Sequence, residues 1–206
     1  MTFTDEQNKA LSAPLSPKVV AKRRQGGGEV SYIEGWHAIA EANRIFGFDG
    51  WTRETLDLRP VGQTYENKNG NKVVNYSCRV RICVGDLIRE GCGFGQGIDR
   101  DEGQAHESAL KEAETDAMKR AFMTFGNPFG LALYDKTQSN VREAPPPTIT
   151  DEQRNELMAL CDSSGFPVKR FLDTAKITDL RQLPADKFAG GKAWIIEQIA
   201  LQKEAA

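Results

Sequence analysis

The most regular part of the chain is residues 91–125, GCGFGQGIDRDEGQAHESALKEAETDAMKRAFMTF. Glycine occupies alternate positions at its start: Gly91, Gly93, Gly95 and Gly97. Alanine then recurs every four positions: Ala105, Ala109, Ala113, Ala117 and Ala121. A period of four predicts a helix, here from Ala105 to Phe125, whose small side chains let it lie close against a sheet. Before it we expect a strand over about residues 86–93 and a glycine-rich loop where another backbone approaches.

Two further strands are predicted upstream, over residues 51–58 and 72–84. Between them lies Asn69-Gly70, a strong hairpin signal. Along the second strand apolar residues alternate with polar ones that include Arg79 and Arg81. Apolar spacing predicts a helix over residues 32–46. This order predicts an α+β fold: a curved antiparallel β-sheet with a β-β-β-α core, packed by the long helix.

A triple proline divides the chain. Pro145, Pro146 and Pro147 cannot continue a helix or a sheet, so residues 141–149 are interpreted as a Pro-rich linker. The linker separates a domain of residues 1–140 from a small all-α module of residues 150–206. Thr150 and Gln153 form a capping-box pattern that opens the module, and further helices are expected over residues 168–175 and 193–202.

Charge and hydropathy exclude several classes of protein. The 27 Lys and Arg against 29 Asp and Glu give a formal net charge of −2, so no strongly basic field surrounds the whole chain. Any nucleic-acid binding must come from a local patch. No apolar run approaches the ~20 residues of a membrane-spanning helix, and residues 1–20 are too polar for a secretory signal. We therefore expect a cytoplasmic protein with no membrane partner.

Cofactor sites have little support in the sequence. The four cysteines have neither metal-knuckle nor disulfide-framework spacing, and we expect them to be reduced and buried: Cys78, Cys83, Cys92 and Cys161. The alternating glycines match neither phosphate-loop fingerprint, so no ATP site and no cofactor are expected.

The long helix also carries four acids, Glu107, Glu112, Glu114 and Asp116. Clustered carboxylates could hold the metal ion of a nuclease, which is the alternative function for this chain. Acids near a helix N-terminus are also favoured by the helix dipole, and acids further along balance basic residues one turn away. The spacing favours this second, structural interpretation.

Three basic clusters could form a local patch. They are Lys119 with Arg120, Arg79 with Arg81, and Lys18, Lys22, Arg23 and Arg24 before the glycines at 26–28. The third is interpreted as a mobile basic segment that meets phosphates. Lys119 and Arg120 can also be interpreted as cations that complement the helix dipole on a solvated face. The aromatic residues among them are typical of a core: Tyr32, Trp36, Phe48 and Trp51.

Several sequence blocks occur together in one order. They are residues 26–35 (GGGEVSYIEG), 42–51 (ANRIFGFDGW), 93–95 (GFG), 112–121 (EAETDAMKRA) and 125–131 (FGNPFGL). The series resembles the blocks of the Rad52/Rad22 family of single-strand annealing proteins over about residues 15–137. The chain is similar to a prokaryotic or phage member.

The resemblance implies a ring of many identical subunits around which a positively charged groove holds single-stranded DNA. It implies ATP-independent annealing of complementary strands in homologous recombination and DNA repair, by a binding protein rather than an enzyme. The family's inner-groove positions correspond here to Arg23, Tyr32, Lys119 and Arg120. A further groove arginine of the family corresponds to Met123, for which Arg24, Arg79 or Arg81 could compensate.

The resemblance also implies an outer DNA site, whose nearest matches are Lys72 and Arg100. Residues 150–206 fall outside the resemblance. Three roles stay open for this module: binding a recombination or single-strand-binding protein, an auxiliary DNA contact, or a passive element at the ring edge.

Overall fold

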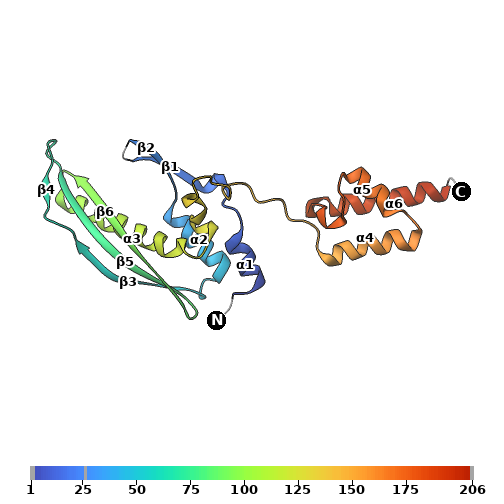
Figure 1. Ribbon diagram of the computed structural model, residues 1–206, viewed down its shortest axis with the longest axis horizontal. Helices are drawn as coiled ribbons and strands as arrows, with labels where there is room; N and C mark the ends of the chain where they lie inside the picture. The colour runs from blue at the N-terminus through green and yellow to red at the C-terminus, as the bar shows by residue number, and fades with distance from the viewer. Residues whose placement is uncertain (1–2, 26, 205–206) are drawn as a thin grey trace. The chain divides into compact units, whose positions relative to one another are not determined.

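The computed structural model describes residues 3–25 and 27–204, which form two compact units, Met1–Ala144 and Pro145–Ala206 (Figure 1). Each unit has its own hydrophobic core. No helix within the described residues is long and apolar enough to cross a bilayer. The larger unit contains, in order, α1 (Asp5–Ser12), η1 (Pro17–Val19), β1 (Val20–Gln25), β2 (Gly28–Ile33), α2 (Gly35–Phe46), β3 (Thr52–Pro60), β4 (Tyr65–Glu66), β5 (Lys72–Val84), β6 (Leu87–Asp99), α3 (Glu102–Met123), η2 (Asn127–Phe129) and η3 (Leu131–Tyr134).

The main sheet is antiparallel and has β5 at its centre. On one side β5 pairs with β3 and with the short β4, and on the other it pairs with β6 from Lys72↔Asp99 to Val84↔Leu87. The apolar face predicted for β5 is confirmed, because Cys78, Val80 and Ile82 are at most 3% exposed. α3 runs along this face (Figure 1). The α+β class predicted from the sequence is therefore correct.

The contact between β6 and α3 is a main-chain contact. A Cβ atom built on Gly93 would lie 2.2 Å from Ala117 N, and one built on Gly97 would lie 1.7 Å from Ala105 O. Two strand residues advance ~6.7 Å and four helix residues advance ~6 Å, so alternate glycines of β6 stay nearly in step with every fourth residue of α3. Sheet and helix can therefore touch along their whole common length.

This packing corrects the predicted glycine-rich loop. The close approach of another backbone was predicted correctly, but residues 94–99 belong to β6 and remain paired with β5. The glycines face α3, and the residues between them, such as Cys92 and Phe94, are exposed. Cys92 was expected to be buried. Among the other free cysteines, Cys78 and Cys161 are buried and Cys83 is partly buried.

The start of the helix predicted over residues 32–46 was also wrong. Tyr32 and Ile33 end β2, which pairs with β1 in a two-stranded hairpin, and α2 begins only at Gly35. The cluster interpreted as a mobile basic segment therefore belongs mostly to β1, which pairs with β2 up to Gln25↔Gly28. Gly26 of the glycine block lies outside the described residues.

Aromatic packing fixes the C-terminal end of α3. Phe122 is fully buried, stacks on Phe129 with ring centroids 5.1 Å apart and meets Trp51 at the same centroid distance. The aromatic residues among the basic clusters were expected to lie in the core, and this expectation is wrong for two of the four. Trp36 is 62% exposed and Phe48 is 86% exposed.

The second unit is helical: α4 (Asp151–Ser164), α5 (Val168–Ala175), η4 (Leu180–Gln182), η5 (Ala185–Lys187) and α6 (Phe188–Glu204). The capping box at Thr150 and Gln153 is present, and α5 has the predicted bounds. α6 begins five residues before the predicted start at 193. Its core includes Leu157 and Ile195, both with no exposed surface, and Phe171 at 4%.

The glycine contact predicts the effect of adding one methyl group. Gly93→Ala places its Cβ atom against the main chain of Ala117 and Ala113, which cannot give way without moving α3. We expect a loss of about 3 kcal/mol in the free energy of unfolding, the upper part of the range for overpacked cores. Chemical denaturation followed by tryptophan fluorescence measures it.

The matched control is Cys92→Ala, a substitution one residue away on the exposed face of the same strand. It should change stability by at most about 0.5 kcal/mol, as for other surface positions. Equal denaturation midpoints for the two variants would show that β6 and α3 are not in main-chain contact.

Candidate nucleic-acid interface

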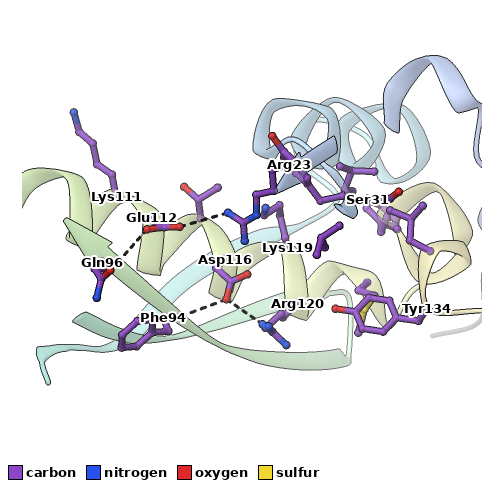
Figure 2. A pocket seen from close by; sticks show the side chains of 18 of the residues that line it. Arg23, Ser31, Phe94, Gln96, Lys111, Glu112, Asp116, Lys119, Arg120 and Tyr134 are labelled. Atoms are coloured by element: carbon purple, nitrogen blue, oxygen red, sulfur yellow. Dashed lines mark hydrogen bonds and ion pairs between the residues drawn. The ribbon is translucent and has the colours of Figure 1, made fainter. Parts of the chain in front are cut away.

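A cleft of about 1000 Å³ lies between the β1–β2 hairpin, the exposed side of α3 and the turns η2 and η3 (Figure 2). Its charged lining residues are five cations, Arg23, Arg24, Lys111, Lys119 and Arg120, and two carboxylates, Glu112 and Asp116. The cleft is therefore a local concentration of positive charge in a chain whose formal net charge is −2.

The hairpin register places its two important side chains in the cleft. Arg23 pairs with Val30 and Ala21 pairs with Tyr32, so Arg23, Val30 and Tyr32 share one face of the β1–β2 ribbon. That face meets α3, because Arg23 lies 3.6 Å from Glu112. The strand pairing predicts this geometry once the hairpin exists, since alternate residues must share a face.

Tyr32 is half-buried between two cations. The Arg23 guanidinium carbon and the Lys119 Nζ atom each lie 5.4 Å from the centre of its ring. Such contacts contribute about 0.5–2 kcal/mol each and hold the cations in place. Tyr32 therefore fixes the positions of Arg23 and Lys119 relative to each other.

Burial lowers the pKa of Lys119 below its ordinary value. Asp116 acts in the opposite direction, and the positive charge of Arg23 lowers the pKa further. A lysine in this state gains from a phosphate group, because the added negative charge compensates the desolvation of its ammonium group. The pKa of Arg120 is raised, chiefly by the hydrogen bond that its Nε atom donates to Asp116 at 3.0 Å.

The two carboxylates of the cleft repeat one arrangement. Glu112 accepts the main-chain N–H of Gln96 at 3.0 Å and pairs with Arg23. Asp116, one helical turn later, accepts the main-chain N–H of Phe94 at 3.4 Å and pairs with Arg120 (Figure 2). Both carboxylates thus occupy outward N–H groups of β6 and orient a cation of the cleft.

The arrangement suits a chain of phosphates. Several cations line one hollow, and the carboxylate partners of Arg23 and Arg120 are partly exposed, so they can exchange for phosphate oxygens. Phosphate contacts of this kind position a nucleic acid without reading its sequence, and they release counterions. The ligand class that fits is a polyanion whose binding does not depend on its sequence.

The structure brings together five of the residues proposed from the sequence: Arg23, Arg24, Tyr32, Lys119 and Arg120. Met123 also lines the cleft, so the position where the family carries an arginine contributes no charge. Arg79 and Arg81 do not compensate from within the cleft. They lie on the β5 face opposite the buried one and pair with Glu90 at 3.3 Å and 2.8 Å.

The proposed outer-site residues lie at another part of the sheet. Lys72 starts β5, opposite Asp99 in the register, and Arg100 follows Asp99 directly. Both therefore lie at one end of the β5–β6 ladder. Lys72 pairs with Glu66 at 3.0 Å, and Arg100 is exposed.

Sequence reasoning missed several lining residues. Glu112 and Asp116 were considered only as acids of the helix, not as part of this site. They lie seven and three positions before the proposed cation Lys119, so helical spacing could have placed them on its face of the helix. The hydrogen bonds of Glu112 and Asp116 to β6 could not be predicted, because the predicted strand ended before Phe94 and Gln96, which donate them. Tyr134, on η3, carries no sequence signal that sets it apart.

Within residues 3–25 and 27–204, no group of three His, Cys, Asp or Glu side chains is placed so that it could hold a metal ion. The acids of α3 instead make ion pairs. Asp116 pairs with Arg120, and Glu107 pairs with Lys111.

Comparison with known proteins gives a family match over residues 4–147, which include the whole cleft. The matching profile is described as Rad52/22 family double-strand break repair protein. The DNA repair and recombination protein rti1 of Schizosaccharomyces pombe is 40% identical over 141 residues, covering 65% of this chain and 38% of that protein. The DNA repair and recombination protein rad22 of the same organism is 39% identical over 144 residues, covering 68% of this chain and 30% of that protein.

The DNA repair and recombination protein RAD52 of Eremothecium gossypii is 38% identical over 139 residues, covering 66% of this chain and 32% of that protein. The matches thus span less than two fifths of each relative's length.

The lowered pKa of Lys119 predicts a pH dependence. A protonated Lys119 attracts phosphate, so its contribution is present below its pKa and is lost as pH rises through that value. Because the pKa is lowered, we expect wild-type affinity for oligothymidylate to fall at a pH below the ordinary lysine value of ~10.4. Fluorescence anisotropy, measured from neutral pH up to the ordinary lysine value, gives this loss of affinity.

The control for this experiment is Lys119→Arg, which keeps a positive charge over the whole range. Its affinity should fall less steeply with pH than that of the wild type. Parallel pH profiles would show that the ammonium group of Lys119 does not contact the ligand.

Proposed function

The chain belongs to the Rad52/22 family of double-strand break repair proteins, and from this premise we propose that it binds single-stranded DNA in the cleft and anneals complementary strands without ATP. The process served is homologous recombination and DNA repair. The observation that carries the proposal is the convergence of Arg23, Lys119 and Arg120 on one hollow of the family-matched region.

Annealing needs a strand that is held by its backbone while its bases stay free. Cations that neutralise phosphates meet this requirement, since they leave the Watson–Crick edges unoccupied. The ion pairs of Arg23 with Glu112 and of Arg120 with Asp116 join partly exposed side chains, so replacing a carboxylate by a phosphate costs little. The strand can therefore be held and released by exchange of ion pairs, without a chemical step or an enzyme's active site.

A ring of identical subunits forms the second part of the proposal. Trp36 and Phe48 expose large aromatic side chains on the unit that carries the cleft, and aromatic residues are enriched in protein interfaces. β3, which does not line the cleft, has one strand neighbour, β5, among the described strands. Packing between subunits would cover these features and would join successive clefts into a continuous path for DNA.

The proposal also assigns a separate role to each of three segments of the chain. Residues 1–140 form the DNA-binding domain, residues 141–149 the linker, and residues 150–206 a module that binds a recombination or single-strand-binding protein. A second hollow, of about 380 Å³, supports the last assignment. It lies on the helical unit, and its lining includes Met158, Leu172 and Arg154.

Loss of one cleft cation tests the binding site. Arg120→Ala should lower affinity for single-stranded DNA about tenfold or more, as charge-assisted hydrogen bonds are worth ~1.5–3 kcal/mol. The slope of log affinity against log salt should fall by about 0.7 for each phosphate that the variant no longer neutralises. Anisotropy against salt measures both, and annealing of labelled complementary strands with Mg²⁺ but no ATP should fall in parallel.

Arg79→Ala is the matched control, because Arg79 is a partly exposed arginine in an ion pair outside the cleft. It should leave affinity, slope and annealing unchanged. Equal effects of the two substitutions would reject the cleft as the site. Shortened strands in the same reaction would favour the nuclease alternative.

Assembly has its own test. Sedimentation velocity at micromolar concentration should show a species many times larger than one chain of 22.8 kDa. Phe48→Ser, on an 86% exposed side chain, should weaken assembly while leaving the fold of each subunit intact. A stable wild-type monomer would contradict the ring.

A further inference from the structure

Tyr134 is an exposed aromatic residue on the wall of the cleft. It ends η3, lines the hollow with Arg120 and is 64% exposed. Figure 2 shows its ring beside the Arg120 side chain, with the hydroxyl group directed toward it. A large aromatic side chain left open to solvent in a cationic cleft is available to a ligand.

The other tyrosine of the cleft is not available in this way. Tyr32 is half-buried, and Arg23 and Lys119 both lie against its ring. Stacking on Tyr32 would displace a cation that the phosphates need. Tyr134 has no such conflict, because its neighbour Arg120 is held by Asp116.

The turn after Tyr134 is closed by hydrogen bonds to one carboxylate. The Asp135 carboxylate accepts hydrogen bonds from the main-chain N–H and the hydroxyl of Thr137, at 2.9 Å and 2.7 Å, and from the hydroxyl of Ser139 at 2.9 Å. These bonds, that of the Thr137 hydroxyl first, lower the pKa of Asp135 to about 2. On the other side Leu133 N donates to Gly130 O.

These bonds fix the main chain on both sides of Tyr134, so its place on the cleft wall is set before a ligand binds. We propose that Tyr134 stacks on a nucleobase of the bound strand, next to a phosphate held by Arg120. The inference rests on the proposed single-stranded DNA site. Stacking uses the face of the base and leaves its pairing edge free, so it is compatible with annealing and independent of sequence.

The test combines two variants with two probes. The probes are oligothymidylate and an abasic oligonucleotide of the same length, which keeps the phosphates but lacks bases. Tyr134→Ala should lower affinity for oligothymidylate about fivefold or more, as stacking contributes ~1–3 kcal/mol per base. It should leave the salt slope unchanged and should bind the abasic probe as the wild type does. Tyr134→Phe, which keeps the ring, should stay within about twofold of the wild type on both probes.

Tyr65→Ala is the matched control, since Tyr65 is 54% exposed on β4 and does not line the cleft. An equal loss on the abasic probe, a reduced salt slope, or a loss in Tyr134→Phe as large as in Tyr134→Ala would each overturn stacking. If the wild type bound neither probe, the proposed function would fail as well. If Arg120→Ala weakened binding and Tyr134→Ala did not, only the stacking inference would fail.

Discussion

The main-chain contact between β6 and α3 sets the geometry on which the cleft depends. Any side chain on the facing glycines would collide with helix backbone, since Cβ atoms there would lie between 1.7 and 2.3 Å from it. Because the helix lies this close, short carboxylate side chains on its exposed flank reach the outward N–H groups of β6. The same flank carries Lys119 and Arg120. A wider spacing between strand and helix would leave these N–H groups unpaired and the cations without fixed partners.

The two carboxylates in this mainly cationic cleft have a physical reason. An edge strand exposes N–H groups that invite pairing with another chain, and proteins block them with charges or coverage. Glu112 and Asp116 occupy two such groups and at the same time orient Arg23 and Arg120. The two carboxylates reduce the attraction of the cleft for phosphate, but five cations line it as well, so its charge stays positive. The cleft therefore combines protection of the strand with a surplus of positive charge.

Elements with a strict period could be predicted from the sequence, and those defined by pairing could not. The alanine repeat located α3, alternation located β5, and a capping box located α4. The β1–β2 hairpin was missed because β1 carries three consecutive basic residues and no apolar alternation, so only its pairing partner reveals it. β6 was cut short because glycine opposes a strand locally, whereas the facing helix requires glycine there. In the cleft Arg23, Lys119 and Arg120 could be proposed by resemblance, and Lys111 was missed. The roles of Glu112, Asp116 and Tyr134 depend on contacts between segments distant in sequence.

Near-neutral net charge does not weaken the case for a nucleic-acid ligand, because the field that a phosphate meets is local. Ions screen exposed charges beyond about 8–10 Å at physiological salt. Within that range of a bound strand the relevant groups are those lining the cleft, where cations outnumber carboxylates five to two. Glu90, outside the cleft, pairs with Arg79 and Arg81 instead. Whole-chain charge therefore reports on solubility and long-range steering, and the placement of Arg23, Lys119 and Arg120 by one hairpin and one helix decides what the cleft can bind.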